Sequence, residues 1–183
     1  MNCPLRCRPQ ARGNRNHELP EPRVIRELRW PLAVMGSLLV AFILTGIPLP
    51  DSVNPWRPAW VALTLFYWCI AMPERVGVWW GWFTGVMLDV THGALLGQHA
   101  LGLAFIAYVA VRYHQRIRVF PPVQQALLAG ALIFLHLATM VTLYNALGSR
   151  AYPLWYLGGA LTSALIWPWL FVVLRDLRRK AQA

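Results

Sequence analysis

Six apolar stretches follow one another along the chain, separated by short polar or proline-containing segments. The hydrocarbon of a bilayer is about 30 Å thick, and a helix needs about 20 mainly apolar residues to cross it. Only helices and closed barrels satisfy every backbone polar group in lipid, so these runs predict an all-α membrane protein with six transmembrane helices in a compact bundle. The expected helices cover about residues 30–47, 59–72, 76–90, 100–113, 123–147 and 154–174.

The second and third expected helices are short, and only Pro73, Glu74 and Arg75 lie between them. Two interpretations remain open. Both helices cross the membrane, or they enter it and return as a re-entrant pair, which leaves four full crossings. The segment 112–122, RYHQRIRVFPP, is expected to be a basic loop between the fourth and fifth helices.

The charges predict the orientation of this bundle. Charged residues make up 13% of the chain, against about 25% in soluble domains. With six crossings, fifteen of the 17 lysines and arginines fall on one side. The positive-inside rule then places both termini in the cytoplasm. The net charge of +10 reflects this clustering and not nucleic-acid binding. We expect residues 1–22 to be a disordered basic cytoplasmic tail and residues 23–183 to be a single transmembrane domain.

A glycine stripe on the third expected helix ends at a carboxylate. Gly77, Gly81, Gly85 and Asp89 recur every fourth residue and so lie on one slowly drifting helix face. Glycine at this spacing lets another backbone come close, which is the usual device for packing helices in lipid. Asp89 should therefore face protein, because an Asp at the bilayer centre costs about 2.5–3.5 kcal/mol on insertion scales.

Four polar side chains fall within eleven residues near the expected non-cytoplasmic end: Asp89, His92, Gln98 and His99. Gly93 and Gly97 indicate a bend that could bring these side chains together. Four interpretations stay open. The first is a hydrogen-bonded cap that fixes the turn or receives a partner protein, and the second is a proton or ion relay. The others are a metal site, without the spacing of a known motif, and a substrate pocket.

The fifth and sixth expected helices carry polar and small residues for which we expect a structural role. His136 lies half-way along the fifth expected helix near Thr139 and Thr142, and we expect it to hydrogen-bond between helices. Gly159 and Ser163 form a small-xxx-small pair that predicts helix packing on the sixth. Nucleotide-binding, serine-hydrolase and metalloprotease motifs are missing from the sequence. We therefore expect no catalytic residues, no resident metal and no cofactor.

Four segments are distinctive in their order and spacing: MPERVG, LDVTHGALLGQHAL, YHQRIRVFP and SALIWPWLFVVLRDLRRK. Together they resemble the MreD family of rod shape-determining membrane proteins, and the resemblance covers about residues 24–180. The arginine-rich tail of 22 residues departs from the family pattern. The resemblance implies a multi-pass protein of the bacterial inner membrane. It also implies a helical fold related to the substrate-binding membrane subunits of vitamin importers.

The same resemblance implies a function in cell-wall elongation. A non-catalytic scaffold of this kind would bind the single-span periplasmic protein MreC within the membrane lipid. It would act indirectly with MreB, RodA and a class B penicillin-binding transpeptidase, and support peptidoglycan synthesis. By this analogy Asp89, Gln98 and His99 lie on the partner-binding side, and the glycine-lined faces dock partner helices. The alternative is a membrane subunit of a transporter that binds a small molecule or lipid precursor.

Overall fold

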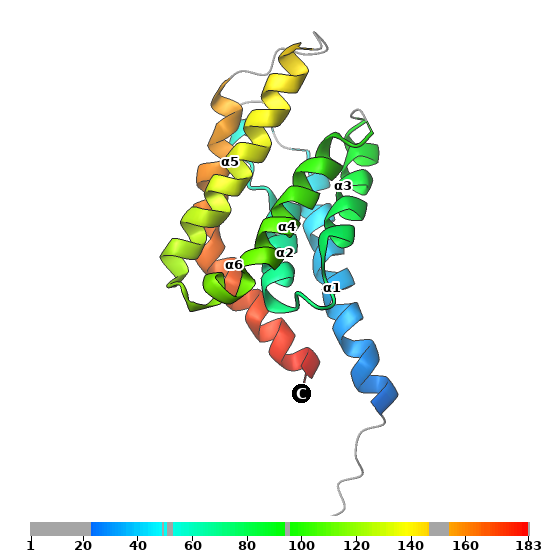
Figure 1. Ribbon diagram of the computed structural model, residues 1–183. Coiled ribbons are helices and arrows are strands. Elements are labelled where there is room, and N and C mark those ends of the chain that lie inside the picture. Colours follow the sequence, from blue (N-terminus) through cyan, green and yellow to red (C-terminus); the bar gives the residue numbers. More distant parts are fainter. Residues whose placement is uncertain (1–22, 49, 51–52, 94–95, 147–153, 183) are drawn as a thin grey trace, which may run out of the picture.

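The computed structural model describes residues 23–48, 50, 53–93, 96–146 and 154–182, which form an all-helical bundle (Figure 1). The elements are α1 (Arg23–Gly46), the 3-10 turn η1 (Asn54–Trp56), α2 (Trp60–Ala71), α3 (Val78–His92), α4 (Gln98–Val119), α5 (Pro122–Ala146), the 3-10 turn η2 (Leu154–Leu157) and α6 (Gly158–Gln182). No strand occurs in these ranges. The six expected helices are thus confirmed as helices. The expected tail, residues 1–22, lies outside the described residues.

Helix α2 forms the centre of the bundle because it is apolar around its whole circumference. Every residue from Val61 to Ile70 is buried, as expected of a helix without a polar face. The helix packs against α1, α4 and α6. Phe66 of α2 and Trp167 of α6 bring their ring centroids to 5.1 Å. Such packing fixes a helix of 12 residues, which is only about 18 Å long and too short to be stable alone.

Helices α3 and α4 form a tight antiparallel pair along the glycine face. A Cβ on Gly81 would lie 2.8 Å from the Cβ of Ala107 and 2.8 Å from the carbonyl oxygen of Leu103. A Cβ on Gly85 would lie 2.6 Å from the backbone nitrogen of Ala100. Gly77, at the start of the stripe, has open space beside it. The chain's own α4 therefore fills the face that the sequence analysis assigned to a partner helix.

The expected loop 112–122 is wrong, because α4 continues as a helix to Val119. Arg, His and Gln are tolerated in a helix, and long basic side chains can extend from it towards the headgroups. The helix ends only where Pro121 and Pro122 follow Phe120. The residue before a proline is driven to extended backbone, and Phe120 has φ −67° and ψ 141°. The true connection to α5 is therefore two residues long.

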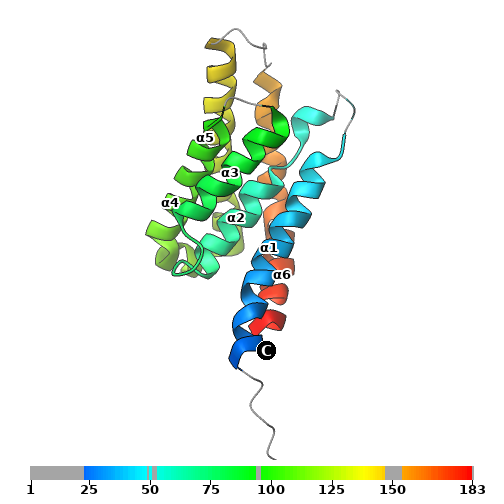
Figure 2. The same ribbon diagram turned by 90° about the vertical axis from the view of Figure 1, so that its right-hand side faces the viewer.

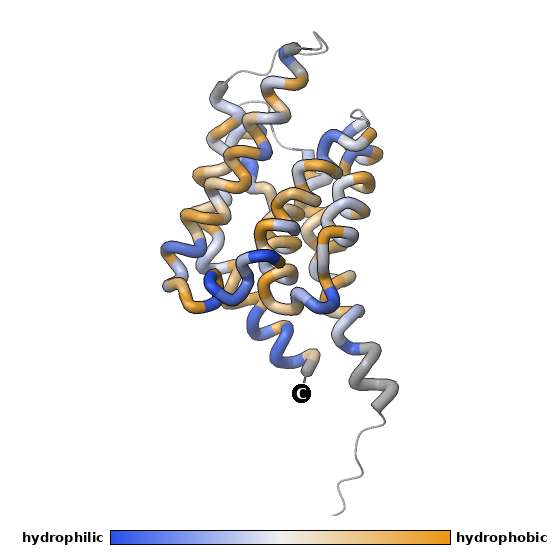
Figure 3. Tube along the Cα trace, viewed as in Figure 1, coloured by the Kyte–Doolittle hydropathy of each residue, from blue (hydrophilic) through white to orange (hydrophobic). Residues whose placement is uncertain are grey.

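The beginning of α1, the α2–α3 turn, the end of α4 and the end of α6 meet at one end of the bundle (Figures 1 and 2). The guanidinium of Arg75, in the α2–α3 turn, lies 4.7 Å from the ring centroid of Trp30 in α1. Hydrophilic residues gather at the same end, and we call it the basic end (Figure 3). The basic residues at this end include Arg29, Arg75, Arg112, Arg116, Arg118, Arg175, Arg178, Arg179 and Lys180.

Three helical segments are long and apolar enough to cross a bilayer by length and composition: Arg29–Gly46, Pro122–Leu143 and Trp155–Ala181. The other helices are too short or too polar to meet this criterion. Helices α2 and α3 are short, with 12 and 15 residues, and the second half of α4 carries Arg112, Arg116 and Arg118. Three helices are thus able to span a membrane, and α2, α3 and α4 complete the bundle.

The close α3–α4 contact predicts the effect of a single methyl group. We expect Gly85→Ala to lower the free energy of unfolding in detergent by about 1–3 kcal/mol, because the added Cβ overlaps the backbone of α4. The matched control is Gly36→Ala in α1, where a Cβ meets nothing within 4 Å. Equilibrium unfolding of the purified protein checks this. Equal stability of the two variants would contradict the packing.

Candidate functional site

Asp89 is fully buried near the end of α3, and its carboxylate caps the beginning of α4. Oδ2 accepts a hydrogen bond from the backbone N–H of Gly97 at 2.8 Å, and Oδ1 accepts one from the N–H of His99 at 2.8 Å. The N–H of Ala100 lies 3.4 Å from Oδ2. These are the N–H groups that a helix leaves without partners in its first turn. Asp89 thus does the work of an N-cap from a neighbouring helix, where a negative charge also suits the helix dipole.

Two glycines shape the turn that makes this cap possible. Gly93 has φ +60° and donates its N–H to the carbonyl oxygens of Asp89 and Val90, which closes α3 with a left-handed residue. Gly97, the residue before α4, has φ +101°. Residues with a side chain rarely adopt either conformation. The bend expected from Gly93 and Gly97 is therefore present, and its carboxylate partner comes from α3.

A row of three imidazoles starts at the same carboxylate. Nδ1 of His99 lies 2.8 Å from Oδ1 of Asp89. The ring of His92 stacks on that of His99 with centroids 5.6 Å apart, and Nδ1 of His92 lies 3.0 Å from the Leu88 carbonyl oxygen. On its other side His99 meets the edge of His136 from α5 at 5.7 Å. The row therefore links α3, α4 and α5 through aromatic contacts.

His136 fits beside α4 because residue 102 is glycine. A Cβ on Gly102 would overlap the His136 ring. The expected hydrogen bond from His136 to another helix is not found at Nδ1, which has no partner among the described residues. Thr139 and Thr142 instead donate to the carbonyl oxygens of His136 and Ala138 in their own helix. The contact of His136 with His99 was not predicted, since 37 residues separate them in the sequence.

Gln98 does not join the Asp89 cluster. Successive residues of a helix point about 100° apart, so the side chain of Gln98 leaves α4 in a different direction from that of His99. Gln98 is buried and lines a cavity of about 430 Å³ with residues of α4 and α5, including His136 and Met140. Neither atom of its amide has a hydrogen-bond partner in the described part of the chain. The structure thus brings together Asp89, His92 and His99 and places Gln98 apart.

A larger cavity, of about 770 Å³, opens at the end of the bundle opposite the basic end. Its walls come from the end of α1, η1, the beginning of α2, the end of α3, the beginning of α4, the middle of α5 and η2. Apolar side chains such as Leu39 and Ile43 form part of the wall, and its polar residues include Arg57, His92, His99, His136 and Tyr156. The histidine row therefore forms part of this cavity wall, which we call the non-basic cavity.

Gly159 and Ser163 of α6 receive the connection between η1 and α2. A Cβ on Gly159 would lie 2.7 Å from the carbonyl oxygen of Arg57. The hydroxyl of Ser163 accepts a hydrogen bond from the N–H of Ala59 at 2.9 Å and lies 2.5 Å from the carbonyl oxygen of Gly159. Gly159 and Ser163 thus pack against the segment that joins η1 to α2. The close contact between α5 and α6 is made by Gly130 and Ala164 instead.

The arrangement at the α3–α4 turn is that of a structural lock. Both Asp89 oxygens accept backbone N–H bonds, so the carboxylate has a defined task in holding the turn. No group of three His, Cys, Asp or Glu side chains among the described residues could hold a metal ion. The chemistry visible here is hydrogen bonding and ring stacking between helices.

A family model described as rod shape-determining protein MreD matches residues 26–177. The chain belongs to the MreD family. The resemblance found in the sequence is thereby confirmed over nearly the same range. The rod shape-determining protein MreD of Haemophilus influenzae is 30% identical over 155 residues, which cover 85% of this chain and 95% of that protein. No solved structure matches.

Membership of the MreD family gives this membrane protein a role in cell shape. The features described above can be placed within the matched range. The α3–α4 turn, the histidine row and the non-basic cavity all lie inside residues 26–177. The Asp89 lock is therefore part of the MreD domain.

The Asp89 lock predicts a specific loss on removal of its charge. We expect Asp89→Asn to destabilise the protein by about 1–3 kcal/mol, because the amide NH₂ must face a backbone N–H that has lost its acceptor. Thr91→Ala is the matched control, since the Thr91 hydroxyl bonds only to Leu88 of its own helix. Equilibrium unfolding in mixed micelles measures the free energy of unfolding of both variants. An Asp89→Asn protein as stable as Thr91→Ala would exclude the lock.

Proposed function

We propose that this member of the MreD family is a non-catalytic membrane scaffold of the bacterial cell-wall elongation machinery. It binds MreC and, through it, acts with MreB, RodA and a class B penicillin-binding transpeptidase to support peptidoglycan synthesis. The observation that carries the proposal is the engagement of Asp89 in a turn lock within a rod shape-determining domain. A carboxylate whose two oxygens accept hydrogen bonds from backbone N–H groups has a structural role.

The proposed topology is six crossings of the inner membrane with both termini in the cytoplasm. Two contacts support full crossings of α2 and α3 over a re-entrant pair. Arg118 of α4 donates to the carbonyl oxygen of Ala71 at the end of α2, and Arg75 lies over Trp30. The α2–α3 turn thus reaches the basic end, whereas α2 begins at the other end beside η1. The positive-inside rule places the basic end in the cytoplasm.

This topology predicts the location of reporters at the two chain ends. We expect a cytoplasm-active fluorescent protein to mature on both the N-terminal and the C-terminal fusion, because α1 begins and α6 ends at the basic end (Figure 2). A periplasm-active phosphatase at either terminus should stay inactive, and the same enzyme inserted after Val53 should be active. Opposite results at the two termini would exclude an even number of crossings.

The docking site for MreC has to lie outside the α3–α4 glycine face, which α4 fills. The rim of the non-basic cavity is the candidate that we propose. In the proposed orientation it faces the periplasm, where the bulk of a single-span periplasmic scaffold would lie. The rim side chains of α1 are apolar and exposed, with Leu39 at 61% and Ile43 at 58%. An apolar, open cavity edge next to an exposed helix suits a transmembrane segment entering from the side.

Neighbouring residues of α1 offer a matched test of this site. Leu39 lines the cavity, whereas Val40 is 54% exposed and faces away from it. We expect Leu39→Trp to reduce co-purification of MreC by about tenfold or more, as a clash at a central interface position does, with Val40→Trp near wild type. Equal recovery of MreC with both variants would remove the cavity rim from the interface.

A second function has its own supporting observation, the size of the non-basic cavity. Its volume of about 770 Å³ lies within the range of small-molecule sites, and polar groups converge on an apolar wall there. A binding subunit of a transporter, with a fold like the membrane subunits of vitamin importers, would use such a cavity. Native mass spectrometry distinguishes the two functions. A tightly retained small molecule that Leu39→Trp expels while MreC still binds would favour the transporter subunit.

A further inference from the structure

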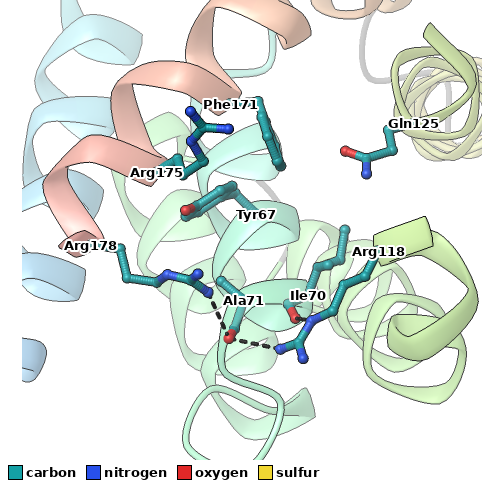
Figure 4. Close-up of a pocket in the computed structure, with 8 residues that line it drawn as sticks. All are labelled: Tyr67, Ile70, Ala71, Arg118, Gln125, Phe171, Arg175 and Arg178. Atoms are coloured by element: carbon teal, nitrogen blue, oxygen red, sulfur yellow. Dashed lines mark hydrogen bonds between the residues drawn. The ribbon is translucent and has the colours of Figure 1, made fainter. Parts of the chain in front are cut away.

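Three arginines from two helices line a cavity at the basic end. Arg118 of α4 donates Nε–H to the carbonyl oxygen of Ile70 at 2.9 Å and Nη2–H to that of Ala71 at 2.9 Å. Arg178 of α6 donates Nη1–H to the carbonyl oxygen of Ala71 at 3.2 Å. Arg175, one helical turn before Arg178, lines the same cavity of about 200 Å³ (Figure 4). We call this the arginine cavity.

The positive charge of the arginine cavity is balanced only in part by the described chain: Asp176, which follows Arg175 on α6, is exposed. No carboxylate among the described residues lies within 4.0 Å of the three guanidinium groups. The one ion pair among these residues joins Asp89 and His99 at the opposite end of the bundle. The C-terminal end of α2 offers the equivalent of only about half an elementary negative charge. Two arginines suffice to satisfy its last carbonyl groups. Arg175 is therefore a surplus positive charge at this site.

Unused hydrogen-bonding groups surround this surplus charge. The Nε–H groups of Arg175 and Arg178 are buried and have no acceptor in the described chain. Gln125 of α5 is 4% exposed and directs its Nε2–H₂ to the carbonyl oxygens of Ile117 and Phe120. Its Oε1 has no partner and is turned toward the cavity (Figure 4). A buried donor or acceptor without a partner is costly, so the site suits a ligand that supplies both kinds of group.

The remaining wall is apolar and aromatic. Tyr67 and Phe171 meet edge to face with centroids 5.6 Å apart, and Figure 4 shows Tyr67 between Arg175 and Arg178. Outside the cavity, α6 exposes Val172 and Val173. A ligand that reaches the arginines from the membrane would thus pass along an apolar helix surface and meet positive charge at headgroup depth.

We propose that the arginine cavity binds the headgroup of an anionic phospholipid, with the phosphate held by Arg175. Guanidinium groups match the geometry of phosphate oxygens and bind them with charge-assisted hydrogen bonds. Basic pockets between transmembrane helices are a general form of anionic-lipid site. A headgroup hydroxyl, as in phosphatidylglycerol, would donate to Oε1 of Gln125. The lipid would then join the end of α6 to the beginning of α5.

Native mass spectrometry of the full chain in phosphatidylcholine nanodiscs that contain phosphatidylglycerol tests the proposal. The variant is Arg175→Gln, because Arg175 makes no hydrogen bond to the described part of the chain that would be lost. The control is Arg179→Gln, which removes the same charge from an exposed position of the same helix. We expect Arg175→Gln to retain phosphatidylglycerol about tenfold less well than wild type, and Arg179→Gln to retain it normally. Equal retention by the two variants, whether reduced or not, overturns the proposal.

Two further measurements separate the possible outcomes. Inorganic phosphate at millimolar concentration should not displace the lipid. If phosphate alone raises the melting temperature of wild type but not of Arg175→Gln, the occupant is free phosphate, and the lipid assignment fails. Arg175→Lys keeps the charge but loses the planar fork, so it should bind several-fold more weakly than wild type and more tightly than Arg175→Gln. If Arg175→Gln does not fold, Arg175→Lys becomes the test variant. Retention of phosphatidylglycerol by Arg175→Lys at the wild-type level then overturns the proposal.

Discussion

Backbone groups at helix ends must find partners inside this bundle, and that constraint organises most of its polar side chains. Lipid offers no hydrogen bonds, so a helix end at membrane depth needs a donor or acceptor from the protein. Side chains of other elements satisfy several of the ends described here. They are Arg57 at the end of α1, Ser163 at the beginning of α2, Arg118 and Arg178 at the end of α2, Asp89 at the beginning of α4 and Gln125 at its end.

These caps explain how helices too short to cross lipid alone can be stable here. Helix α2 has apolar contacts all round, and side chains of α4 and α6 hydrogen-bond to backbone groups at both of its ends. Helix α3 lies against α4 so closely that Gly81 and Gly85 leave no room for a methyl group. Close packing and end-capping therefore act together, because a cap from a neighbour requires that neighbour to be held in place.

The sequence predicted the helices well, since apolar runs and prolines mark them directly. It also predicted the polar turn, because Gly93 and Gly97 stand on either side of it. It could not predict that α4 continues through Arg112 and Arg118, since a basic helix end and a basic loop share one composition. Nor could it predict the capping partners. Ser163 and Ala59 lie 104 residues apart, and only the folded chain brings them together. The direction of Gln98, beside His99, depends on helix rotation that an unaligned sequence does not reveal.

The structure also shows which polar residues have structural tasks and which do not. Asp89 was the strongest functional candidate in the sequence, yet its oxygens hold a turn. Helix α4 occupies the space beside Gly81 and Gly85 of α3. Groups with unfulfilled bonding capacity lie elsewhere, at the non-basic cavity and at Arg175 and Gln125. A scaffold needs a rigid body and free surfaces for its partners. In this protein Asp89 and the glycines of α3 stabilise the fold. Sites for partners or ligands are therefore expected among residues that the fold does not require.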